Sequence, residues 1–193
     1  MKKVGLDDLM GLSAYEKVRP QYRQEIIEYK RNRRLPVGEC VSLVFENRKT
    51  IIFQIQEMIR AEKISDLDKI KEEVDVYNTL IPDSNELSAT LLIEIEDQTK
   101  IREDLLKFLG IDEAVYLKIG KDHYIQAAFE EGRSKEDKIS AVQYVRFHLS
   151  PEAREAFVSG REKILFLIDH PNYEAQAETW KEMRESLSQD LME

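Results

Sequence analysis

Three histidines and one cysteine are the residues of this sequence best suited to acid–base, nucleophilic or metal chemistry. His123, His148 and His170 are 25 and 22 residues apart, so no local metal-binding motif arises from them. Cys40 opens an apolar segment, where a free cysteine is commonly a small buried hydrophobe. The sequence also lacks the glycine-rich phosphate loops, the nucleophile elbow and the HExxH and CxxC motifs. Any site must therefore be assembled by the fold.

The first candidate site lies at the end of two predicted strands, 141–149 and 163–168. The connecting segment, 150–162, meets the minimum of about a dozen residues for a right-handed parallel crossover. If the strands are parallel neighbours, His148 and the pair Asp169–His170 emerge at the same carboxyl end of the sheet, where α/β sheets place ligands. The alternative is that Asp169–His170 forms only a hydrogen-bonded turn. Antiparallel strands would exclude this site.

A second polar group lies on a predicted helix. Gln54, Glu57 and Arg60 have i, i+3, i+6 spacing and therefore share a face. With Glu46 they could form a buried network or the carboxylate half of a metal site; the alternative is an ion-paired helix face. Iron–carboxylate bundles use Glu-x-x-His pairs, and no such pair occurs here. The candidate ligand-binding residues from both groups are His148, Asp169, His170, Glu57 and Arg60.

Charge restricts the partners that we expect. The net charge is −9, from 38 acidic and 29 basic residues. Phosphate binding requires basic surface, so we expect neither nucleic acid nor an anionic membrane as partner. The basic cluster Lys30–Arg34 could bind an anion, but it also follows a predicted helix, where it would offset the helix dipole in solvent. A single cysteine and the lack of a signal-peptide or membrane-spanning segment predict a cytoplasmic protein.

The first 85 residues are mostly helical in pattern. The sequence predicts three helix starts and one strand in this half. The helices start at a Ser13/Glu16 capping box, at an N-cap at Asn47 and at an N-cap at Ser65, and the apolar strand lies at 40–45. The first helix should end at Lys30–Arg34, before Pro36 and Gly38. This half therefore supplies helices and one short buried strand.

Strands dominate from residue 86 onward. The elements expected in this half, in order, are a strand at 87–95, a helix at 98–109 closed by Gly110, a hairpin of strands 115–119 and 124–129, a charged loop at 131–138, a strand at 141–149, a helix from Ser150–Pro151, a buried strand at 164–168, and a helix opened by a Thr179/Glu182 capping box. The predicted fold class is α+β (mixed α/β). We expect a single domain, 1–193, whose helix-rich part (1–85) packs on the sheet-rich part (86–193) around a shared core.

Several stretches together resemble a bacterial family catalogued as domain of unknown function 3501. They are RPQYR (19–23), FENRKTIIFQIQEMIRAEKI (45–64), YNTLIPDSNELSATLLIEI (77–95), EDKISAVQYVRFHL (136–149) and IDHPNY (168–173). The resemblance implies a role beside rubrerythrin-like or iron–sulfur redox proteins, but it supplies no catalytic residues and leaves the cofactor unknown. It directs attention to the matched polar residues, which are Arg19, Glu46, Arg48, Gln56, Glu57, Arg60, Arg146, Asp169 and His170.

Two functions follow as hypotheses. The first is a cytosolic accessory or binding protein that partners redox enzymes, since no nucleophile–base or metal motif is present. The alternative is a metal-dependent or small-molecule-binding enzyme whose His/Asp/Glu site is assembled by the fold. The ligand and the oligomeric state stay open at this point.

Overall fold

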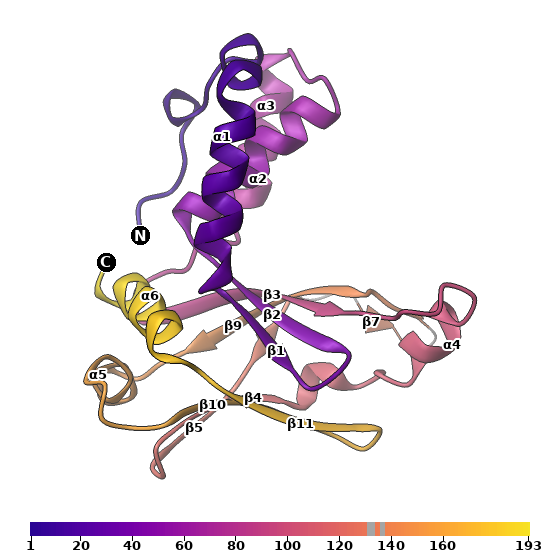
Figure 1. Cartoon of the computed structure of the whole chain (residues 1–193), viewed down its shortest axis with the longest axis vertical. Helices are drawn as coiled ribbons and strands as arrows, with labels where there is room; N and C mark the ends of the chain where they lie inside the picture. The colour runs from indigo at the N-terminus through magenta and orange to yellow at the C-terminus, as the bar shows by residue number, and fades with distance from the viewer. Residues whose placement is uncertain (131–133, 136–137) are drawn as a thin grey trace.

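The computed structural model describes residues 1–130, 134–135 and 138–193 and has the outline of an L (Figure 1). A lobe of three helices stands on a sandwich of two antiparallel sheets. The predicted α+β class, with helices in the first half and sheets mainly in the second, is confirmed. Within the described residues, no helix is both long and apolar enough to cross a membrane.

The lobe consists of α1 (Leu12–Arg31), α2 (Arg48–Ala61) and α3 (Leu67–Asn78), preceded by the 3-10 turn η1 (Leu6–Asp8). Its apolar stripes meet in a cluster of their own, made of Val4, Ile51, Ile55, Ile59, Val74, Leu80 and Ile81. Asn47 caps α2 as predicted, because its side chain accepts from the Thr50 amide at 3.2 Å.

Sheet A has the order β1-β2-β3-β9-β6, and every neighbouring pair is antiparallel. Its strands are β1 (Arg34–Val37), β2 (Val41–Glu46), β3 (Glu86–Ile93), β9 (Val142–His148) and β6 (Ala128–Phe129). Along β9 the predicted alternation holds, since Gln143, Val145 and Phe147 are buried. The lobe stands on the opposite face of this sheet (Figure 1).

Sheet B has the order β11-β10-β4-β5 and is also antiparallel. Its strands are β11 (Tyr173–Glu178), β10 (Ile164–His170), β4 (Val115–Ile119) and β5 (His123–Gln126). The remaining elements are α4 (Ile101–Leu106), η2 (Ile111–Glu113), α5 (Pro151–Val158), α6 (Lys181–Met192) and the short pair β7 (Ser134–Lys135) and β8 (Lys138–Ile139).

The main core fills the space between the two sheets. Phe166 of sheet B contacts both Phe45 and Phe147 of sheet A, with ring centroids 5.0 and 5.2 Å apart. At one side of the sandwich, Ala127 alone separates β5 from β6, so the chain passes directly from sheet B to sheet A. The sandwich core contains buried residues from both parts of the chain, such as Phe45 and Phe166, and a second, smaller cluster lies in the lobe.

The parallel pairing of strands 141–149 and 163–168, on which the first candidate site depended, does not occur. These segments form β9 and β10, which belong to different sheets and have only antiparallel neighbours. The connection through α5 crosses from one sheet to the other. A link of 13 residues that satisfies a parallel crossover can equally span two sheets about 10 Å apart. Its length therefore could not decide between the two arrangements.

Several predicted boundaries also differ. Gly11, not Ser13, occupies the N-cap of α1; Asp66 replaces Ser65 at α3; and α6 begins after Trp180 without a capping side chain. Strands β1 and β11 were not predicted, because Pro36 and the polar alternation of β11 resemble loop sequence. Helix α4 is shorter than the predicted 98–109. Of the predicted charged loop 131–138, residues 131–133 and 136–137 lie outside the described residues.

Candidate ligand-binding cleft

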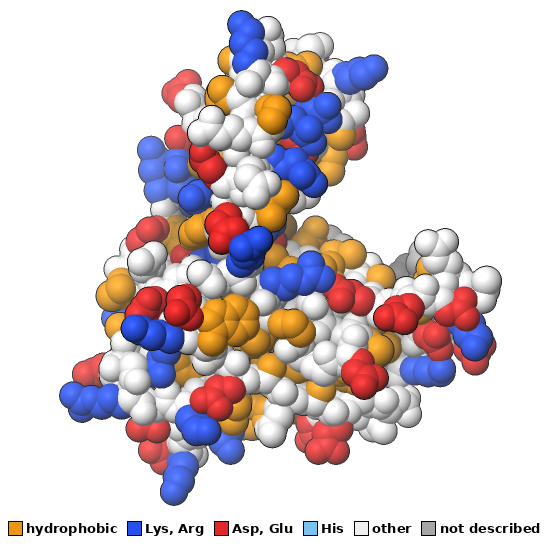
Figure 2. Space-filling model, in the orientation of Figure 1, with side chains coloured by type: hydrophobic (Ala, Val, Ile, Leu, Met, Phe, Trp, Pro, Cys, Tyr) orange, Lys and Arg blue, Asp and Glu red, His pale blue; other side chains and the backbone are white. Residues whose placement is uncertain are grey.

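A cleft of about 340 Å³ lies at the inner corner of the L, between the helical lobe and sheet A. Figure 2 shows the molecule hollowed at this corner. The side chains that line the cleft combine three charges, several hydroxyl or amide groups and an apolar wall: Lys30, Arg34, Val44, Glu46, Ile51, Gln54, Tyr77, Leu80, Thr90, Leu92, Val142 and Tyr144. A concave site with an apolar wall and a few polar groups is the usual form of a small-molecule site.

The sheet positions part of this lining by its register. A single row across sheet A consists of Arg34, Val44, Thr90 and Tyr144, which are successive cross-strand partners. Residues in one row point to the same face of a sheet. The cleft floor is therefore set by β1, β2, β3 and β9, and helices α2 and α3 add Gln54 and Tyr77 from above.

Glu46 is the carboxylate of the cleft, and its side chain is only 9% exposed. It accepts hydrogen bonds from the hydroxyls of Thr50 and, at 3.1 Å, Thr90. The Lys30 ammonium is 3.8 Å away, which is longer than a hydrogen bond. Two hydroxyls thus fix the carboxylate, and the ammonium can reach an additional anion without losing a direct hydrogen bond to Glu46.

Arg34 and Tyr77, two further ionisable residues of the lining, have different surroundings. Arg34 forms a partly exposed ion pair with Glu94 at the rim. Burial raises the pKa of the Tyr77 phenol, so its hydroxyl stays protonated and can donate a hydrogen bond at neutral pH. The cleft therefore offers two cations and a neutral donor beside one carboxylate that is already hydrogen-bonded.

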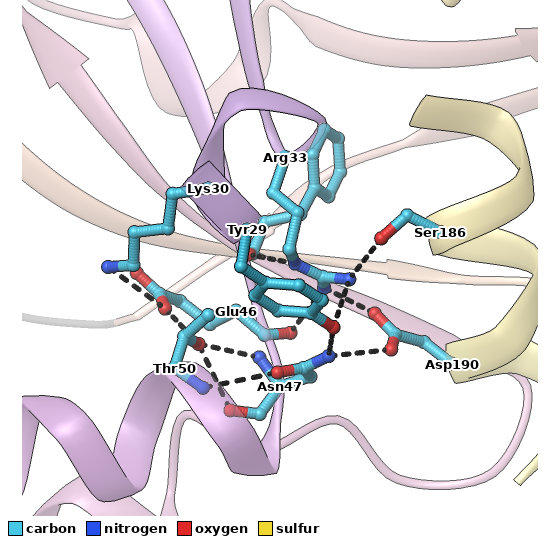
Figure 3. Close-up of polar contacts among 9 residues, drawn as sticks. Tyr29, Lys30, Arg33, Glu46, Asn47, Thr50, Ser186 and Asp190 are labelled. Carbon is cyan, nitrogen blue, oxygen red and sulfur yellow. Dashed lines mark hydrogen bonds and ion pairs between the residues drawn. The ribbon is translucent and has the colours of Figure 1, made fainter. Parts of the chain in front are cut away.

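A buried polar network supports the cleft from behind (Figure 3). Arg33 is completely buried, donates from Nε to the Phe45 carbonyl at 2.9 Å, and forms an ion pair with Asp190 of α6. Its Nη1 donates to Ser186 at 3.0 Å. Sequence placed Arg33 in a solvated basic cluster; that interpretation is wrong for this residue, which connects the end of α1 to β2 and α6.

Asn47 completes the network. Its Nδ2 donates to Asp190 at 2.9 Å and to the Tyr29 hydroxyl at 2.8 Å, while its Oδ1 caps α2. Burial raises the pKa of the Asp190 carboxyl, although the Arg33 guanidinium opposes this shift. With Arg33 and Asn47 on its two oxygens, the carboxylate has partners for the charge that burial disfavours. The junction of lobe and sandwich is thereby held at fixed geometry.

Glu57 and Arg60, two of the predicted site residues, face α1 and not the cleft. Glu57 accepts from Tyr15 and from Arg19 Nε, both at 2.7 Å, and the Arg19 hydrogen bond lowers the pKa of this carboxyl. Arg60 lies 2.7 Å from Glu16. This part of the row is the ion-paired helix face weighed above, and only Gln54 of the same row reaches the cleft.

His148, Asp169 and His170 are not brought together. His148 is 64% exposed and lies 3.0 Å from Glu86, at the end of sheet A. His170 is the buried last residue of β10, beside the turn to β11, where Nε2 donates to the Leu109 carbonyl at 2.8 Å and Nδ1 accepts from the Asn172 amide at 3.2 Å. Asp169 points to the outer face of sheet B. Across the described ranges, no three His, Cys, Asp or Glu side chains are grouped to hold a metal.

Sequence reasoning identified part of the cleft and missed the rest. Lys30, Arg34, Glu46 and Gln54 were noted as an anion-binding cluster or a polar network. Thr90, Tyr77 and Tyr144 were not noted. Only the sheet register, which no local pattern encodes, places them opposite the basic cluster.

Comparisons with known proteins give a family and a structural relative. Residues 3–191 match the family described as "Protein of unknown function (DUF3501)". A crystal structure described as a novel protein of unknown function from Burkholderia pseudomallei K96243 is similar over 98% of this chain and 100% of that one, with 35% identity and a TM-score of 0.92. No curated protein matches the chain.

Proposed function

The chain belongs to the family of unknown function DUF3501, and from the geometry of its cleft we propose that it is a small-molecule-binding accessory protein. The ligand is a small organic anion with an apolar body. The observation that carries this proposal is the Lys30 ammonium, which lines the cleft beside an already hydrogen-bonded carboxylate and whose nearest ion-pair partner among the described residues is 3.8 Å away. Because the proposal does not rest on a nucleophile–base pair, the proposed function is ligand binding and not catalysis.

The lining supports this ligand chemistry in three steps. Lys30 and Arg34 supply positive charge for a carboxylate or phosphate group. Thr90 and Tyr77 supply hydroxyl groups at the same site. Ile51, Leu80 and Leu92 form an apolar wall, which favours a ligand body of comparable polarity. The fixed Arg33–Asp190 junction keeps these groups in place before binding, which reduces the entropic cost of association.

A thermal-shift screen with small carboxylates and organic phosphates tests the proposal. A ligand at 100 times its Kd should raise the Tm by about 5–10 °C. The Lys30→Ala variant should lose this shift, whereas the matched Arg31→Ala variant should keep it, because the Arg31 guanidinium is exposed and pairs with Glu28 outside the cleft. Equal loss in both variants, or no shift with any member of the screen, would refute the proposal.

The partnership with rubrerythrin-like or iron–sulfur redox proteins, and a cytoplasmic location for it, rest on the resemblance and stay predictions. They are compatible with an accessory protein that senses or carries a small anion. Co-purification from the native host under aerobic and microaerobic growth tests them. Recovery of no redox protein under either condition would count against this role and would leave ligand binding as a separate question.

A further inference from the structure

The outer face of sheet B is the layer farthest from the helical lobe (Figure 1). Its outward side chains follow the alternation of the strands: Tyr116 and Lys118 on β4, Leu165, Leu167 and Asp169 on β10, Glu174, Gln176 and Glu178 on β11, and Tyr124 and Gln126 on β5. Four of these ten residues are leucines or tyrosines. The other six are polar or charged, so apolar and charged groups are mixed on this face.

Two unpaired acids occupy one end of this face. Asp169 and Glu174 are direct cross-strand partners, and neither has an ion-pair or hydrogen-bond partner for its side chain among the described residues. Like charges placed directly opposite in a sheet destabilise it. They border a hollow of about 540 Å³ that is also lined by Tyr124 and Leu167. Two carboxylates beside an aromatic ring are the surroundings that an ammonium or guanidinium group prefers.

The opposite end of the same face carries a cation that could fill this hollow. Lys118 points outward from β4, opposite Tyr124, and its ammonium has no ion-pair partner in the described part of the chain. The other lysine near this end, Lys163, already pairs with Glu178 at 3.3 Å. Between Lys118 and the two acids lie Leu167 and Tyr116, whose ring stacks on Tyr124 at 4.7 Å, while Leu165 lies beside Lys118 in the same cross-strand row.

We propose that this face binds a second copy of the chain, with the acidic end of each copy against Lys118 of the other. A two-fold axis in the interface, perpendicular to the strands, exchanges the two ends and places the leucines of both copies together. The same patch then serves both copies, as an isologous dimer requires. A basic protein of another kind would bind the acidic end of the face, but its binding would not explain the unpaired Lys118 at the other end.

The expected dimer is weak and concentration-dependent. Four strands of about five residues cover roughly 300 Å², given a strand spacing of about 4.8 Å and a rise of about 3.4 Å per residue. Standard interfaces bury about 800 Å² of accessible surface on each side. We therefore expect a dissociation constant in the micromolar range. Sedimentation velocity should show a shift from 22.6 kDa towards twice this mass as the concentration of the full chain rises.

Charge exchange tests the proposed contact. The single substitutions Lys118→Glu and Asp169→Lys should each weaken the dimer about tenfold or more, because each places like charges together. The double variant should return to within a few-fold of the native affinity. Lys71→Glu, an exposed change on α3, is the matched control and should leave the dimer unchanged. Circular dichroism should be the same for all variants.

Three results would overturn the proposal. The first is a monomer at every concentration, which is also the outcome expected if the face serves a basic protein of another kind. The second is a dimer that ignores both single substitutions. The third is a double variant as weak as the single ones, since repulsion without rescue would place the contact elsewhere. None of these outcomes affects the proposed ligand cleft, which lies on the other side of the sandwich.

Discussion

Among the described residues, Arg33 is the largest fully buried side chain, and its charge is matched by one carboxylate there, that of Asp190. We expect Arg33→Met to lower the free energy of unfolding by about 3–5 kcal/mol, because it leaves Asp190 buried without its counter-ion. The double variant Arg33→Met/Asp190→Leu should recover much of this loss. Urea denaturation of the native chain and both variants measures the difference. A double variant less stable than the single one would contradict this account.

Glu57 gives a pH-dependent prediction within the lobe. Its pKa is lowered, chiefly by the Arg19 hydrogen bond, so its contribution to stability is present above its unfolded-state pKa and is lost as pH falls through the lowered folded-state value. We expect Glu57→Gln to cost about 1 kcal/mol at pH 7 and progressively less as pH falls below the ordinary carboxyl pKa of 4.5. Thermal melts across this range check it. A cost that is independent of pH would assign the loss to packing.

At the same scale, sequence could list candidate side chains but could not pair them. Glu57 and Arg60 were grouped correctly on one helix face, yet their partners, Arg19 and Glu16, come from a helix about 40 residues earlier. His170 could be a ligand or a turn residue from sequence alone. In the structure, the backbone carbonyl of Leu109 and the backbone amide of Asn172 form hydrogen bonds with the two ring nitrogens of His170. These bonds show that His170 stabilises the turn.

Among the elements, α2 and α5 allow a comparison of two helix caps. Ser150 caps α5 by accepting a hydrogen bond from the Ala153 amide, whereas Asn47 caps α2 and also donates to Tyr29 and Asp190. We expect Ser150→Ala to cost about 1 kcal/mol, as a typical cap does, and Asn47→Ala to cost about 2–3 kcal/mol. Chemical denaturation measures both. Equal costs would show that the hydrogen bonds to Tyr29 and Asp190 contribute little.

Helices and strands with strong local sequence signals were predicted well, whereas strands whose place depends on the neighbouring strands were not. The hairpin β4–β5, the alternation of β9 and the start of α5 follow from turn residues, period and capping. In contrast, the neighbours of β10 could not be predicted, because an apolar run indicates that a strand is buried but not which strands lie beside it. Edge strands such as β1 and β11 have the weakest pattern, since one side of each is solvated or contains Pro36.

For the whole molecule, the change from helices to strands near residue 85 does not coincide with a division in space. The hairpin β1–β2 comes from the first half, yet it pairs with β3 and completes sheet A. Phe45 of β2 is part of the sandwich core. The Arg33 network then ties α1 and α2 to α6, the last helix of the chain. Two hydrophobic clusters are thus joined by segments that belong to both.

Limited proteolysis at the exposed turn near residues 83–84 tests whether the halves can separate. A nick there should leave both fragments associated under native conditions, because residues 34–46 stay hydrogen-bonded within sheet A and their apolar side chains stay in the sandwich core. The fragments should part only in denaturant. Native size-exclusion chromatography of the nicked protein, followed by denaturing electrophoresis, distinguishes the outcomes. If two stable, separate halves eluted, the lobe would be an independent domain, and the buried Arg33–Asp190 junction would not hold it in place.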